Sequence, residues 1–223
     1  MSTADRPAPL IAMILEKLEE QTERLNHLIS MIPSDRMNWR PEVNGPSGAD
    51  IWTVSELLGH LLDCLAGFCA SIFAVHGEKL PDWEKLRALP VNHSCGGEEA
   101  AERIRTYMQH LEHGFRLLEP GDLTRRVSTV FVPEGEPLLV LLLGNLEHLV
   151  NHKFQLFFYL KLLGVPVESR DLYRFRTTAP SGSDPSHCFK CGRDLGPQLE
   201  WKKMDTQAGP ICYVCFNQPS TPS

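Results

Sequence analysis

The chain has 223 residues, a formal net charge of -6 at pH 7 and 42% hydrophobic residues. This length accommodates one full-sized domain with a small appendage, and a main body of about 165 residues can bury most of its apolar surface without disulfides. A polyanion would meet net repulsion outside any local basic patch. The charge therefore argues against nucleic acid as a partner.

The first residues, MSTADRPAPL, lead directly into an amphipathic pattern. They lack the charged start, apolar run and small-residue cleavage site of a secretory signal peptide. The longest apolar stretch, from Leu138 toward Leu163, is interrupted by polar and charged residues between Asn145 and Gln155. These interruptions predict a core helix rather than a membrane span. We therefore expect a cytoplasmic protein that does not bind a membrane.

Four stretches before residue 165 have apolar residues at intervals of three and four, which is typical of amphipathic helices. The first runs from Leu10 to Ile29 and stops before Pro33. The second begins at Thr53, where Thr53 and Glu56 have the spacing of a capping box, and ends near Gly77.

The third stretch runs from about Glu98 to Leu118, and the fourth is bounded by Pro137 and Gly164. The segments between the four stretches do not show the repeated period-2 alternation of a sheet. The pattern predicts an all-α four-helix bundle over residues 1–166, joined by long crossovers.

The composition changes after the fourth helix. The segment 167–187 is rich in Arg, Thr, Pro, Ser and Gly and has little apolar surface to bury, which indicates a flexible linker. A small module at 188–217 and a disordered tail at 218–223 complete the expected organisation.

Two C-x2-C knuckles form the most specific motif in the chain. They contain four of the seven cysteines and are separated by about 20 residues, the spacing of a structural four-thiolate zinc site. The expected ligands are Cys188, Cys191, Cys212 and Cys215. In a reducing compartment such pairs favour a metal over disulfides. A redox pair, an iron centre of rubredoxin type and unpaired surface cysteines are the alternatives.

This zinc-ribbon-like module has few apolar residues, so zinc would supply most of its folding free energy. We expect it to be an independent folding unit. Limited proteolysis should cut the chain within 177–186, and chelation of the zinc should unfold only the C-terminal segment.

A line of polar residues follows the otherwise apolar fourth helix. Steps of three and four residues place its members on one face: Asn145, His148, His152, Gln155 and Tyr159. A buried polar line is costly unless each member has a partner, and a metal satisfies two imidazoles spaced at i and i+4. His60 on the second helix also points inward. The sequence thus suggests a site at His60, His148 and His152 for zinc, nickel or iron.

The spacing alone leaves another interpretation open. Two histidines four residues apart are more often a solvent-facing or hydrogen-bonded pair. His110 and His113 on the third helix lie among polar residues and are expected on a solvated face.

Three segments of the chain resemble the signature regions of the DinB/YfiT-like proteins. They are Ile32–Pro41, Thr53–Leu61 and His148–Leu156. The resemblance covers about residues 8–166, and the last motif, His-x3-His-x2-Gln, is fairly specific. It implies a four-helix bundle that holds a divalent metal through one histidine of the second helix and two of the fourth. Those residues are His60, His148 and His152 here.

The resemblance also implies a class of activity, because characterised relatives are thiol-dependent S-transferases or isomerases. We therefore expect a metal-dependent S-transferase or hydrolase-like enzyme that takes a low-molecular-weight thiol and an electrophilic small molecule. Glu56, Gln155 and Tyr159 are the candidate catalytic residues. Capping of the second helix at Thr53 is the alternative role for Glu56.

A second hypothesis is a non-enzymatic metal-binding scaffold or regulatory protein whose zinc module mediates protein interaction. The family commonly has Arg-Gly after the last histidine, whereas this chain has Lys153 and Phe154. Phe154 is therefore expected to narrow the approach to the metal. A homodimer is one option for the assembly.

Overall fold

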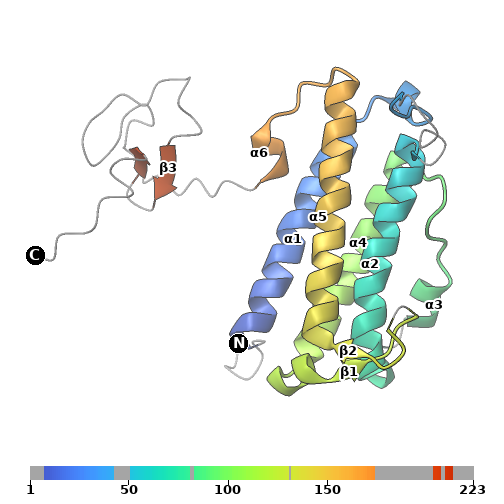
Figure 1. The fold of residues 1–223 in the computed structure, drawn as a ribbon, viewed down its shortest axis with the longest axis vertical. Helices are drawn as coiled ribbons and strands as arrows, with labels where there is room; N and C mark the ends of the chain where they lie inside the picture. Colours follow the sequence, from blue (N-terminus) through green and yellow to red (C-terminus); the bar gives the residue numbers. More distant parts are fainter. Residues whose placement is uncertain are drawn as a thin grey trace, which may run out of the picture. The chain divides into compact units, whose positions relative to one another are not determined.

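The computed structural model describes residues 8–42, 51–80, 83–130 and 132–173, together with two short strands nearer the C-terminus. The chain divides into two units, Met1–Tyr173 and Arg174–Ser223. The first unit contains four long helices among its described residues (Figure 1). They are α1 (Pro9–Ser30), α2 (Val54–His76), α4 (Gly97–Leu117) and α5 (Leu138–Leu162).

The four long helices form a bundle, as the sequence predicts. Helix α2 packs against α4 and α5, and α1 packs against the same two helices. In Figure 1, α1 and α5 run in one direction, while α2 and α4 run in the opposite direction. This arrangement places the N-terminal half of α2 beside the C-terminal half of α5.

Helix α2 begins at the expected cap. The Thr53 hydroxyl accepts a hydrogen bond from the Glu56 amide at 3.2 Å, and the Glu56 carboxylate accepts one from the Thr53 amide at 2.7 Å. By length and composition, α2 is apolar enough to cross a membrane. However, 61% of its apolar window is buried inside the structure.

Short elements connect the long helices. The turn η2 (Ser34–Arg36) follows α1, while η4 (Gly77–Lys79) and α3 (Trp83–Arg87) follow α2. The turn η5 (Pro120–Thr124) and the paired strands β1 (Arg126–Val127) and β2 (Glu136–Pro137) lie between α4 and α5. These short elements lie in the connections between the four predicted helices.

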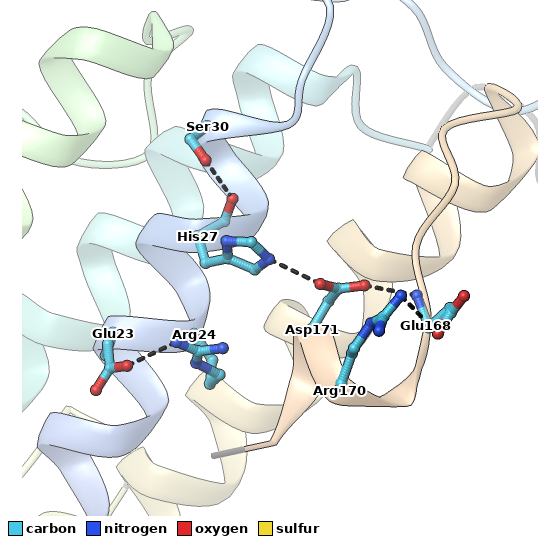
Figure 2. A network of polar contacts seen from close by, with 7 residues as sticks. All are labelled: Glu23, Arg24, His27, Ser30, Glu168, Arg170 and Asp171. Atoms are coloured by element: carbon cyan, nitrogen blue, oxygen red, sulfur yellow. Dashed lines mark hydrogen bonds and ion pairs between the residues drawn. The ribbon is translucent and has the colours of Figure 1, made fainter. Parts of the chain in front are cut away.

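The bundle extends beyond the expected boundary at residue 166. Helix α6 (Ser169–Leu172) contacts α1, and His27 Nε2 lies 2.8 Å from an Asp171 carboxylate oxygen (Figure 2). Leu172 is buried, and its carbonyl accepts a hydrogen bond from Lys153 of α5 at 2.8 Å. The start of the predicted linker is therefore packed structure, because these contacts attach it to α1 and α5.

In the second unit, β3 (Lys203–Thr206) pairs antiparallel with β4 (Gly209–Cys212), with Lys203 opposite Cys212. The rest of the predicted linker, the zinc module and the tail lie outside the described residues. The cysteine side chains expected to bind zinc also lie outside them. The four-cysteine site therefore stays a prediction.

Candidate metal site

The structure brings together the three histidines that the sequence singles out. His60 comes from α2, while His148 and His152 lie one turn apart on α5. Each offers a ring nitrogen, and these nitrogens all lie within 4.8 Å of one another. The Nε2 atoms of His60 and His148 are 3.0 Å apart. Ligand atoms at such separations can share one ion.

A chain of hydrogen bonds sets the orientation of His152. The Tyr159 hydroxyl donates to the carbonyl of Trp52 at 3.1 Å, so it accepts from the Gln155 amide nitrogen, also at 3.1 Å. The Gln155 oxygen is then left to accept from Nδ1 of His152 at 2.9 Å. With its proton on Nδ1, His152 keeps the lone pair of Nε2 free for a metal.

His60 is oriented by a residue from a loop. Its Nδ1 lies 2.7 Å from the side-chain oxygen of Asn92, which can only accept a hydrogen bond. The proton of His60 is therefore on Nδ1, and Nε2 presents its lone pair toward His148. Asn92 has φ 52°, a left-handed conformation that Asn tolerates better than most residues.

The loop carrying Asn92 is fastened to the start of α2. The Asn92 amide donates to the Gly59 carbonyl at 3.1 Å, and the Cys95 amide donates to the Ser55 carbonyl at 3.1 Å. A Cβ at Gly59 would lie 1.7 Å from the His93 carbonyl oxygen. Glycine at position 59 is therefore what allows the loop to approach α2 and bring Asn92 to His60.

Burial favours the metal-binding form of the two histidines on α5. Desolvation lowers the pKa of His148, and the neighbouring His60 lowers it further. Desolvation also lowers the pKa of His152, although its hydrogen bond to Gln155 opposes this effect. Both rings are therefore neutral at pH 7 and have lone pairs available for coordination.

The indole of Trp52 covers one side of the cluster. Its ring centroid lies 4.3 Å from that of His60 and 5.4 Å from that of His152. The three imidazoles themselves remain half-buried. The cluster thus has an aromatic wall and retains access to solvent.

The other polar residues on the same face of α5 also have partners. Asn145 donates to the hydroxyl of Ser71 at 3.4 Å and packs over Gly67 of α2. Gln155 and Tyr159, two of the candidate catalytic residues, position His152. Along this polar line, Asn145 therefore contributes to helix packing, and His148 and His152 belong to the histidine cluster. Gln155 and Tyr159 orient His152 within that cluster.

Glu56 lies in the helix cap, where its carboxylate bonds to both the amide and the hydroxyl of Thr53. The backbone hydrogen bond from Thr53, followed by the side-chain bond, lowers the pKa of Glu56. These contacts favour the capping role over that of a general base. Both hydrogen bonds of the Glu56 carboxylate go to Thr53, and neither goes to a histidine of the cluster.

Phe154 does not narrow the approach to the histidine cluster, contrary to the expectation from the sequence. Its side chain is 53% exposed, and its ring lies 6.0 Å from that of Phe157. Two residues beyond His152 on a helix, it points away from the face that carries the histidines. Lys153 is buried and bonds to Gln21 of α1, so neither residue restricts the site.

Comparison with known proteins shows the family. A model of the DinB superfamily matches residues 17–156, which is more than half of the chain and includes all three histidines. The chain belongs to the DinB superfamily. The match excludes the C-terminal cysteines, so it says nothing about the predicted zinc module.

The DinB fold is also seen in a solved structure. A DinB-like protein, YjoA, from Bacillus subtilis superimposes with a TM-score of 0.53 and is 18% identical, covering 73% of this chain and 99% of that chain. At this identity the likeness shows the fold alone. No curated protein matches this chain.

Two residues that contact the histidine cluster were not predicted from the sequence. Asn92 lies in a segment without helical periodicity, and Trp52 precedes a helix cap, so neither shares a repeating pattern with the histidines. For Asn92 a weak signal exists, because Asn readily adopts left-handed turns and can accept a hydrogen bond there. No comparable local signal identifies Trp52.

Proposed function

We propose that this protein is a metal-dependent enzyme that binds a divalent ion through His60, His148 and His152 and acts on a low-molecular-weight thiol. The main support is the convergence of three imidazole nitrogens within 4.8 Å of one another. A cluster of three protein ligands leaves at least one coordination position for an exogenous group. That open position distinguishes a reactive site from a closed structural one.

The three imidazole ligands restrict which metal ions the site can bind. Three neutral imidazoles suit zinc, nickel or iron better than magnesium or calcium, which prefer oxygen ligands. When bound, such an ion would lower the pKa of a coordinated thiol or water and supply a nucleophile near neutral pH. The preference for a thiol rests on the resemblance to characterised DinB/YfiT-like relatives.

The protein's own residues would orient the reaction. Asn92 and Gln155 hold the Nδ1 protons of His60 and His152, and Trp52 provides an apolar surface for a substrate's carbon atoms. In the proposed transfer, the thiol loses its proton to solvent and its sulfur forms a bond to an electrophilic carbon. The leaving group departs with the electron pair of the bond that breaks.

Turnover and metal dependence together test this function. Metal-replete protein is assayed with a panel of low-molecular-weight thiols and monobromobimane as the electrophile, and compared with chelator-treated protein and with His152→Ala. We expect at least one thiol to be consumed faster with the metal-replete protein than with either the chelator-treated protein or His152→Ala. A parallel experiment places cobalt at the three-histidine site and follows its absorption spectrum. If no thiol changes this spectrum and no thiol is turned over, the proposal is contradicted and the scaffold hypothesis is favoured.

A further inference from the structure

A second group of potential ligands lies in and beside the loop that carries Asn92. His93 and Cys95 belong to this loop, and Glu99 lies in the first turn of α4. One ligand atom from each residue lies within 4.8 Å of those from the other two. We propose that His93, Cys95 and Glu99 form a second metal site that takes zinc or a similar divalent ion. This proposal does not depend on the activity of the first site.

The contacts of His93 leave its ring able to bind an ion. Its Nε2 lies 2.8 Å from a Glu99 carboxylate oxygen. Its Nδ1 is buried and has no hydrogen-bond partner among the described residues. A buried, unpaired ring nitrogen is unfavourable. Nε2 already faces the Glu99 carboxylate, and a metal shared by His93 and Glu99 would replace this hydrogen bond.

The position of the Cys95 sulfur is fixed by the backbone. The Cys95 amide bonds to the Ser55 carbonyl of α2, and the side chain is buried. Its thiol donates a hydrogen bond to the neighbouring Gly96 carbonyl at 3.4 Å. The sulfur would bind a metal as the thiolate.

The mixed ligand set favours zinc. An imidazole, a thiolate and a carboxylate are all ligands that zinc accepts, and the two anionic groups would balance its charge. A thiolate disfavours magnesium and calcium. The side chains of His93 and Glu99 are 27% and 45% exposed, so an ion can reach the cluster from solvent.

Arg103 is the cation that competes for Glu99. Its guanidinium lies 3.6 Å from the carboxylate oxygen. The same guanidinium donates to the Pro90 carbonyl at 2.6 Å and to the Tyr107 hydroxyl at 2.9 Å, so these bonds retain Arg103 when Glu99 turns toward a metal. We therefore expect weaker binding than at a closed four-thiolate site.

A bound ion would connect the loop to α4. The loop is already attached to α2 through Asn92 and Cys95. Because Asn92 orients His60, the second ion would also stabilise the loop conformation that supports the first site.

Cobalt substitution can test the site in the full-length chain. The predicted C-terminal ligands are first removed by the combined substitutions Cys188→Ser, Cys191→Ser, Cys212→Ser and Cys215→Ser. The remaining cysteines are Cys64, Cys69 and Cys95, all buried in the bundle. Titration of this protein with cobalt should give about two bound ions per chain and a near-ultraviolet band from thiolate-to-cobalt charge transfer.

Added to this background, Cys95→Ser should abolish the thiolate band and one binding equivalent, whereas Cys64→Ser should preserve both. Glu99→Gln should weaken the binding that produces the band at least about tenfold. His148→Ala should leave the band in place. Circular dichroism checks that each variant retains its helices, and Glu99→Gln gives the deciding result if Cys95→Ser does not fold. Absence of the band in the starting protein, or its persistence after Cys95→Ser, would overturn the proposal.

Discussion

The side-chain oxygen of Asn92 lies 2.7 Å from Nδ1 of His60, although 32 positions separate the two residues in the chain. This hydrogen bond orients the imidazole toward the other two histidines. Asn92→Gly keeps the left-handed backbone accessible but removes the acceptor. We expect the metal affinity of the three-histidine site to fall about 10- to 100-fold, as measured by competition with a chromophoric chelator.

Asn92→Asp is the matched control, because it retains an acceptor oxygen at the same position. Its metal affinity should remain close to that of the unsubstituted protein or exceed it. Equal losses in Asn92→Gly and Asn92→Asp would show that the hydrogen bond to His60 is not what supports binding.

Gly59→Ala should destabilise the bundle and weaken metal binding together. The added Cβ would lie 1.7 Å from the His93 carbonyl, so the loop carrying Asn92 must move. We expect a loss of about 3 kcal/mol in the free energy of unfolding, measured with urea. Gly144→Ala is the control. That glycine is exposed within α5 and a Cβ meets no atom within 4 Å, so the substitution should stabilise the protein by about 0.5–1 kcal/mol.

A buried carboxylate away from the histidine cluster predicts a pH dependence of stability. His76 Nε2 lies 2.7 Å from a carboxylate oxygen of Asp122, and each side chain is 11% exposed. Burial alone would raise the pKa of Asp122, but the Glu119 amide, His76 and Arg125 together lower it. The ionised carboxylate therefore stabilises the fold at pH values above its usual pKa. This contribution disappears as the pH falls through the lowered pKa.

Asp122→Asn should consequently cost about 2–3 kcal/mol in the free energy of unfolding at pH 7. The difference between the two proteins should shrink as the pH falls below about 4. Urea unfolding at several pH values measures it. A difference as large at pH 3 as at pH 7 would rule out this role for the Asp122 carboxylate.

The C-terminal cysteines give a prediction that separates the module from the bundle. Replacing Cys188, Cys191, Cys212 and Cys215 by Ser should remove about one zinc ion per chain. We expect the helical circular dichroism and the melting temperature of the bundle to be retained, since the long helices have their own core. Loss of most of the helical signal would show that the module is required for the bundle to fold.

Local sequence signals predict much of the fold. The sequence predicts that the second helix begins at Thr53 and the fourth at Pro137, and these residues are the N-caps of α2 and α5. Helix caps and prolines act within a few residues, so their effects can be recognised in sequence. The packing of α6 is not predicted from the sequence. It depends on the hydrogen bond from Lys153 to the Leu172 carbonyl, and the position of Lys153 in the helical pattern does not indicate this long-range partner.

The same distinction applies to the site. His148 and His152 share one face of a helix, and their spacing alone makes them a candidate pair. Asn92 reaches His60 only through a left-handed backbone and the close approach of its loop to Gly59. Such a relationship depends on tertiary structure, so helical periodicity does not predict it.

The proposed function requires His60, His148 and His152 to bind one ion. Elemental analysis of metal-replete protein, compared with His152→Ala, tests it most directly. His113→Ala, at an exposed position of α4, is the control and should not alter the metal content. We predict that His152→Ala loses about one equivalent of divalent metal while retaining its helical circular dichroism. If His152→Ala and His60→Ala both keep the full metal content of the unsubstituted protein, the three histidines do not form the metal site.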